Sequence, residues 1–124
     1  MAFDGIEIPE EDRATFIRVL GVMIDAAHNN SKSKGFWDES RNVGEAIALL
    51  HSEASELLEG MRDGNPESKK IPGFTQAEEE AADLVIRLGD MKGFFSGSAW
   101  RLGEAIIAKM KYNSTRPHKH ARKF

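Results

Sequence analysis

Apolar residues recur at helical spacing in four segments of this chain of 124 residues. Within each segment they return every three or four positions, which is the period of an amphipathic helix. The segments run from about Pro9 to Asn29, Val43 to Met61, Thr75 to Lys92 and Ala99 to Tyr112. No segment shows the strict alternation that is typical of a strand. The pattern therefore predicts an all-α fold, with four main helices arranged as a bundle.

Polar residues mark several of the predicted helix ends. Asn42 is placed to cap the second helix, with Glu45 three positions later as its capping-box partner. Thr75 and Glu78 have the same relationship at the start of the third helix, and the polar run from Asn29 to Gly35 predicts the end of the first. We expect the apolar stripe of the second helix to face the core, and it consists of Val43, Ile47, Leu50, Ala54, Leu57 and Leu58.

Composition places the chain among ordinary globular proteins, with 40% hydrophobic and 30% charged residues. Its length predicts a single domain over residues 1–124. The absence of cysteine excludes disulfides, thiolate metal sites and cysteine nucleophiles. The segment from Met1 to Pro9 lacks the basic and apolar regions of a signal peptide, and no apolar run is long enough to span a membrane. We therefore predict a cytoplasmic protein that does not contact the membrane.

The net charge of −3 conceals a basic C-terminal tail, residues 109–124, which contains no acidic residue. Such a tail either binds nucleic acid or supplies phosphate ligands to a site in the same molecule. Its lysines and arginines are Lys109, Lys111, Arg116, Lys119, Arg122 and Lys123.

Two acidic pairs carry the candidate chemistry. Glu53 and Glu56 lie three positions apart in the second predicted helix, and Glu80 and Asp83 do so in the third. Residues at this spacing project from one helix face, so each pair offers two carboxylates to a shared ligand. Oxygen ligands favour Mg²⁺, for which Mn²⁺ can substitute, and Mg²⁺ in turn binds phosphates. The pairs therefore predict a metal site that acts on a phosphate compound.

Solvated helix surface is the alternative explanation for each pair taken alone, because surface carboxylates are common. On a helical wheel, however, Glu80 falls inside the apolar stripe of its helix and Asp83 lies beside it. A carboxylate bordering the core is costly unless it is paired or metal-bound. Arg87 is placed to neutralise this pair, but one arginine cannot balance four carboxylates.

The order E-x-x-E and then E-x-x-D on successive helices resembles the MazG-like branch of the all-α nucleoside triphosphate pyrophosphohydrolases. The resemblance covers the chain from about Ile17 to its C-terminus. It implies Mg²⁺-dependent hydrolysis of a (deoxy)nucleoside triphosphate to the monophosphate and pyrophosphate by a homodimer or homotetramer. It also implies that metal binding and catalysis fall to Glu53, Glu56, Glu80 and Asp83.

Other positions match the same family. Its members often place a histidine in the first helix and a tryptophan in the following loop to line the base pocket, and here these are His28 and Trp37. The C-terminal tail is similar to that of short, single-domain members from phages, some of which act on dGTP. The resemblance therefore implies dGTP or GTP as substrate, and contacts to phosphate or sugar from Lys109, Asn113 and Arg116.

Two other classes compete with this hypothesis. A nucleic-acid-binding or regulatory helical bundle would explain the basic tail but not the inward-facing Glu80. A carboxylate-bridged di-iron bundle expects Glu-x-x-His pairs among its ligands, and the sequence contains none. The enzyme hypothesis accounts for the most features, and nucleic acid is not expected as a partner.

Overall fold

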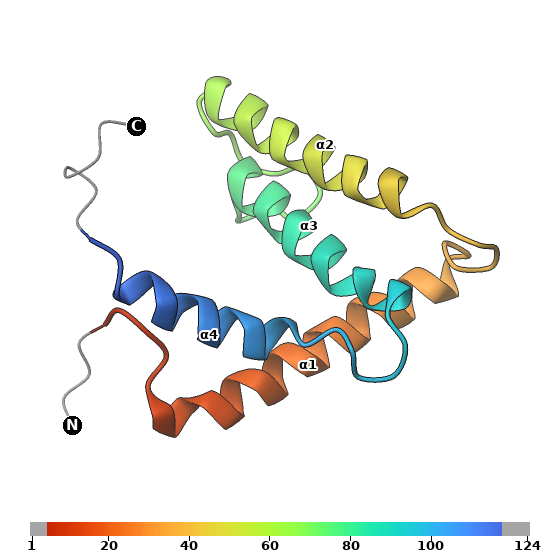
Figure 1. Cartoon of the computed structure of the whole chain (residues 1–124). Coiled ribbons are helices and arrows are strands. Elements are labelled where there is room, and N and C mark those ends of the chain that lie inside the picture. Colours follow the sequence, from red (N-terminus) through yellow and green to blue (C-terminus); the bar gives the residue numbers. More distant parts are fainter. Residues whose placement is uncertain (1–4, 118–124) are drawn as a thin grey trace. The chain divides into compact units, whose positions relative to one another are not determined.

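The computed structural model describes residues 5–117, in which four α-helices and one short 3₁₀ helix follow one another (Figure 1). This part of the chain contains no strand, only an isolated bridge between Glu67 and Thr75. The helices and the lack of strands in residues 5–117 confirm the all-α prediction. None of the described helices is both long and apolar enough to cross a membrane. The helices are α1 (Glu10–Ser33), α2 (Val43–Arg62), α3 (Gln76–Asp90), η1 (Met91–Phe94) and α4 (Leu102–Ser114).

The first helix is longer than predicted, because the polar run after Asn29 does not end it. The helix continues to Ser33, and the chain then turns at Gly35, which has a φ of +88°. The amide of Phe36 donates to the carbonyl of Ser31 at 3.2 Å, which closes a Schellman-type turn that satisfies the last carbonyls. The left-handed glycine, rather than the polar composition, sets the helix end.

The predicted N-caps of the second and third helices are confirmed, although among the described residues only the Asn42 half of the capping box expected with Glu45 is formed. The side chain of Asn42 accepts a hydrogen bond from the amide of Glu45 at 3.0 Å. Thr75 and Glu78 form a complete capping box, with each side chain bonded to the backbone of the other residue. These caps satisfy amides that a helix start leaves without partners, and they fix where α2 and α3 begin.

The described residues fall into two compact units. One unit consists of the described parts of Met1–Gly21 and Arg101–Phe124, and therefore contains the first half of α1 together with α4. Gly103 is buried there, and a Cβ at this position would lie 3.5 Å from the Cα of Ile17. The missing side chain lets the start of α4 pack directly on the backbone of α1.

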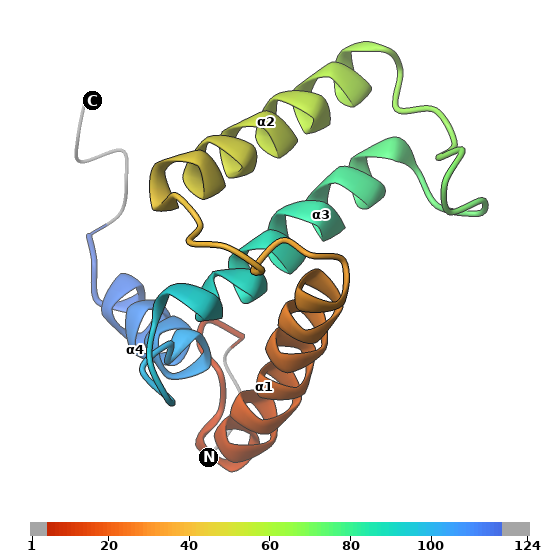
Figure 2. The same ribbon diagram turned by 90° about the vertical axis from the view of Figure 1, so that its right-hand side faces the viewer.

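The other unit, Val22–Trp100, contains the end of α1 with α2, α3 and η1. In both views α2 and α3 lie side by side and run in opposite directions (Figures 1 and 2). The end of α1 approaches α3 at Gly89, where a Cβ would lie 3.3 Å from the Cα of Ile24. Ile24 and Ala46 are the buried apolar residues of this unit. Its interior is therefore small, and much of it is polar.

The expectation that the apolar stripe of α2 faces the core is wrong for several of its residues. Val43, Ile47 and Leu58 are 49%, 42% and 51% exposed. The buried residues of α2 are instead Ala46, Glu53 and Gly60, which recur every seven positions along one face. This face packs on α3 because two of its residues are small, and it carries Glu53 into the contact.

Candidate functional site

Three carboxylates from two helices meet in the unit formed by Val22–Trp100. Glu53 comes from the middle of the buried face of α2, and Glu80 and Asp83 lie one turn apart on α3. One ligand oxygen from each lies within 4.8 Å of the others, which is close enough for a single metal ion. Glu53 and Glu80 are only 7% and 6% exposed, and Asp83 is half-buried. The two helices thus form a carboxylate cluster, defined as Glu53, Glu80 and Asp83.

Two oxygens of this carboxylate cluster are buried without a hydrogen-bond partner among residues 5–117. They are Oε2 of Glu53 and Oε2 of Glu80. The other oxygen of Glu53 accepts a hydrogen bond from Nε of Arg87 at 2.8 Å. A buried polar atom without a partner costs free energy, more so when it is charged. A hard cation would remove that cost, so the donor set fits Mg²⁺ or Mn²⁺.

The protonation of the carboxylate cluster follows from its burial. Burial, together with the neighbouring Glu53, Glu56 and Glu79, raises the pKa of Glu80 to about 8. Burial and the charge of Glu53 also raise the pKa of Asp83. Burial acts in the same direction on Glu53, but the hydrogen bond from Arg87, then those with the carboxyls of Glu80 and Glu56, and last the charge of Arg87 give Glu53 a lowered pKa. Without metal, Glu80 is therefore largely protonated at neutral pH, and a cation would displace that proton.

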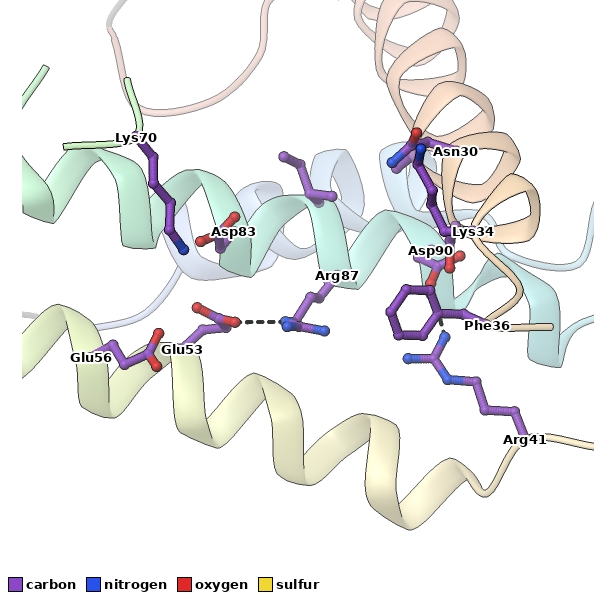
Figure 3. A pocket seen from close by; sticks show the side chains of 13 residues that line it. Asn30, Lys34, Phe36, Arg41, Glu53, Glu56, Lys70, Asp83, Arg87 and Asp90 are labelled. Atoms are coloured by element: carbon purple, nitrogen blue, oxygen red, sulfur yellow. Dashed lines mark hydrogen bonds and ion pairs between the residues drawn. The ribbon is translucent and has the colours of Figure 1, made fainter. Parts of the chain in front are cut away.

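The carboxylate cluster opens on a pocket of about 470 Å³ (Figure 3). Glu53, Glu56 and Asp83 lie at one end of it, and Phe36 and Arg41 lie at the other. This arrangement gives the pocket an acidic end that suits a metal, and a second end with an aromatic ring and positive charge. The remaining lining residues are Ala27, Asn30, Ser31, Lys34, Lys70, Ile86, Arg87 and Asp90.

A second pocket of about 470 Å³ borders Glu80. The loop between α2 and α3 forms part of it, and Ser68 holds this loop in place. Ser68 is 3% exposed; its hydroxyl donates to Glu79 at 2.5 Å and accepts from the amide of Lys70 at 3.2 Å. Glu56 and Lys70 line both pockets. Glu56 is exposed, so it lies at the rim of the carboxylate cluster rather than within it.

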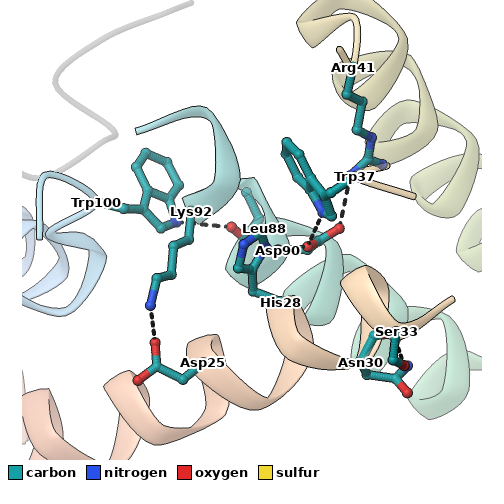
Figure 4. A network of polar contacts seen from close by, with 10 residues as sticks. All are labelled: Asp25, His28, Asn30, Ser33, Trp37, Arg41, Leu88, Asp90, Lys92 and Trp100. Atoms are coloured by element: carbon teal, nitrogen blue, oxygen red, sulfur yellow. Dashed lines mark hydrogen bonds and ion pairs between the residues drawn. The ribbon is translucent and has the colours of Figure 1, made fainter. Parts of the chain in front are cut away.

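The far end of the first pocket is built around Asp90 (Figure 4). This buried carboxylate bonds to the Nδ1 of His28 at 2.9 Å and accepts from the indole nitrogen of Trp37 at 2.8 Å and from the guanidinium of Arg41 at 2.9 Å. Arg41 also lies over the Trp37 ring, 4.8 Å from its centroid. Burial opposes the charge of Asp90, but these hydrogen bonds outweigh it and hold the pKa of Asp90 below its usual value. The Asp90 network, defined as these four residues, fixes the loop after α1 on the end of α3.

The structure brings some of the predicted site residues together within one unit. Glu53, Glu80 and Asp83 form the carboxylate cluster, with Glu56 beside it. His28 and Trp37, predicted to line a base pocket, bond to Asp90 instead, and neither is among the described residues that line the first pocket. Lys109, Asn113 and Arg116 are exposed residues of the other unit, and residues 118–124 of the predicted tail lie outside the described part.

The sequence analysis did not single out Asp90, Arg41 or Phe36, which the structure places at the first pocket. It considered Arg87 only as a competing counter-ion for the pair on its own helix, whereas Arg87 bonds to Glu53 of α2. A usable signal was present in the spacing. One face of α3 carries a continuous charged line of Glu80, Asp83, Arg87 and Asp90, at steps of three, four and three positions.

Comparison of the chain with protein-family models, curated proteins and solved structures finds no match. The case for a function therefore depends on the chemistry of the site.

Proposed function

We propose that this protein is a divalent-metal-dependent nucleoside triphosphate pyrophosphohydrolase of the MazG-like kind. The observation that carries the proposal is the pair of buried glutamates, Glu53 and Glu80. Each has one oxygen without a partner within residues 5–117. Glu53 lines the acidic end of the first pocket, and Glu80 lines the second pocket. Solvated surface carboxylates have neither property. The E-x-x-E and E-x-x-D order supports the same assignment.

Glu53, Glu80 and Asp83 would hold Mg²⁺, and Glu56 lies beside them at the rim of the pocket. Bound Mg²⁺ supplies neutralisation of phosphate charge and a lowered pKa for water. The Arg87 hydrogen bond fixes the orientation of Glu53 and leaves its second oxygen available to the cation. Each of these side chains therefore has one defined task.

The reaction we propose is attack of water on the α-phosphorus of the triphosphate. A bond forms between the water oxygen and the α-phosphorus, and the bond to the bridging oxygen breaks to release pyrophosphate. Glu56 is the residue we assign to accept the proton of the water, because it is exposed at the pocket and lies outside the three-carboxylate group. A base in that position acts without giving up a metal ligand.

The base of the nucleotide is assigned to the far end of the first pocket. Phe36 is 57% exposed and lines the pocket, so it offers a face for stacking. Asn30 lines the same end and offers both a donor and an acceptor to a base edge. Phe36 thereby takes the role first predicted for Trp37.

The family resemblance is the ground for two further parts of the proposal. The substrate is dGTP or GTP, and its phosphates or sugar are contacted by Lys109, Asn113 and Arg116.

We also propose that the protein works as a homodimer or homotetramer. Val43, Ile47, Leu58 and Met61 leave an exposed apolar row along α2, with Met61 56% exposed. Exposed apolar residues grouped in this way mark association surfaces. A second copy covering α2 would remove this surface from water.

The test is incubation of the purified protein with each of the eight common NTPs and dNTPs in the presence of Mg²⁺, followed by identification of the products. Monophosphate and pyrophosphate are expected, and relative rates would give the base and sugar preference. Glu53→Gln and Asp83→Asn should each lower kcat by at least about 100-fold. Glu104→Gln, a change at an exposed residue of α4, serves as the matched control. Retained pyrophosphate release in both cluster variants would contradict the proposal, as would salt-dependent DNA binding without turnover.

A further inference from the structure

Arg87 has two sets of donors, and the described residues engage only one of them. Its Nε donates to Oε1 of Glu53 at 2.8 Å, which ties α3 to α2. Its two terminal nitrogens make no hydrogen bond within residues 5–117. The side chain lines the first pocket and is 33% exposed. Figure 3 shows the guanidinium between Glu53 and the aromatic end of the pocket. In the proposed function, the phosphates that join the metal to the base would cross this position.

The other cations that line this pocket are less suited to bind an anion. Arg41 is engaged by the buried Asp90 at 2.9 Å and is 14% exposed. Lys70 is 81% exposed, and Lys34 is also exposed, so both stay hydrated and mobile. A half-buried guanidinium, held in place on one side and with paired donors on the other, is pre-organised for phosphate oxygens.

We infer that Arg87 forms a phosphate-binding subsite beside the metal carboxylates, with Nε holding Glu53 while the terminal nitrogens bind oxygens of a pyrophosphoryl group. The inference rests on the proposed function and extends it. The ligand class is an oligophosphate, either free pyrophosphate or the polyphosphate part of a nucleotide. Arg87 thus contacts the substrate and also positions Glu53, a metal ligand.

This double role predicts opposite effects on two ligands. A glutamine at position 87 keeps an amide donor for Glu53 and removes the repulsion of a positive charge toward a nearby cation, so metal affinity should stay the same or rise. The same change removes charge-assisted hydrogen bonds to phosphate, which are worth about 1.5–3 kcal/mol, or roughly 10- to 100-fold in affinity. An arginine that only orients Glu53 would bind no phosphate, so at saturating metal its replacement would leave pyrophosphate affinity unchanged.

The experiment compares Arg87→Gln, Arg87→Lys and the wild type in two direct binding measurements. Mn²⁺ alone is titrated and followed by electron paramagnetic resonance of the free ion. Inorganic pyrophosphate is then titrated by calorimetry at saturating Mn²⁺. For Arg87→Gln we expect unchanged or tighter Mn²⁺ binding and a Kd for pyrophosphate that is roughly 10- to 100-fold higher. Arg87→Lys should fall between, because it keeps the charge and loses the planar fork.

Arg62→Gln removes an arginine at the exposed end of α2, outside this pocket, and should change neither constant. Weaker Mn²⁺ binding with unchanged pyrophosphate binding in Arg87→Gln would overturn the inference. An equal loss of pyrophosphate binding in Arg62→Gln would overturn it as well. A wild type that binds pyrophosphate through Arg87 but turns over no nucleotide would refute the proposed function and leave the subsite standing.

Discussion

Glu53 on α2 and Glu80 on α3 bring carboxylate oxygens within 4.8 Å of each other, although both side chains are more than nine-tenths buried. Within residues 5–117 only Glu53 has a cationic partner, since Arg87 bonds to it. Glu80 is therefore neutral at pH 7 in the absence of metal, and the contact is between a carboxylate and a carboxylic acid. This relationship makes the stability of the protein depend on both pH and metal.

Glu80→Gln should stabilise the metal-free protein, with a gain that grows as the pH rises. The pKa of Glu80 is about 8 in the folded protein against 4.5 for an ordinary glutamate. The folded state therefore holds its proton more tightly, and the free energy of unfolding falls as the pH rises from about 4.5 to about 8. A glutamine has no such proton to lose. Thermal unfolding in a chelator should show equal melting temperatures near pH 4 and a higher one for the variant at pH 8, by roughly 4 °C for each kcal/mol.

Metal should act in the opposite direction, by stabilising the wild type more than the variant. Mg²⁺ or Mn²⁺ at 100 times its Kd should stabilise the wild type by about 2.7 kcal/mol, because ligands of the native state shift the unfolding equilibrium. Glu80→Gln loses one ligand oxygen and should gain much less. A wild type whose melting temperature does not respond to either cation would argue against a metal in the carboxylate cluster.

Asp90→Asn should destabilise the protein by about 3 kcal/mol, because it leaves the partly buried Arg41 without its counter-charge. Trp37→Phe removes one of the hydrogen bonds to Asp90 and should cost about 1 kcal/mol. Chemical denaturation of both variants measures these costs.

Phe36→Ala, by contrast, should change the Michaelis constant for nucleotides with little loss of stability, since this ring is exposed. Equal losses of stability for Phe36→Ala and Asp90→Asn would contradict the assignment of Phe36 to substrate binding and of Asp90 to the stability of the fold.

Gly93→Ala should be destabilising by about 1–3 kcal/mol. A Cβ at Gly93 would lie 2.5 Å from the Trp37 ring and 2.7 Å from the His28 ring. Neither ring can retreat without breaking its bond to Asp90. The control is Gly21→Ala in α1, where a Cβ meets nothing within 4 Å, and where alanine should be neutral or stabilising by about 0.5–1 kcal/mol. Denaturant midpoints that shift equally in both variants would refute the steric argument.

Ile47→Glu and Leu58→Glu should weaken self-association by at least about 100-fold, because each places a charge on the exposed apolar row of α2. Ala48→Glu adds the same charge to an exposed position of α2 outside that row and should leave the oligomer intact. Sedimentation equilibrium measures both. A wild type that is monomeric at all concentrations would rule out association through this row.

Local sequence signals predicted the elements well, because their causes are local. The caps at Asn42 and Thr75 depend on residues three positions apart, so the pattern was sufficient to place them. The burial of Glu80 was also foreseen from its place on the helical wheel. The buried face of α2 was not, because α3 covers its small residues rather than its largest apolar ones. The partner of Arg87 lies 34 positions away, a relationship that no helical period contains.

The Asp90 network has a further consequence for how the protein unfolds. Its three hydrogen bonds join residues 49 to 62 positions apart, with His28, Trp37 and Arg41 all converging on one carboxylate. Contacts that close such long loops carry a large entropy cost and are expected to form after the folding transition state. Breaking them should therefore accelerate unfolding while leaving the folding rate nearly unchanged. Asp90 would act on the lifetime of the folded chain, and hence on its resistance to degradation by proteases.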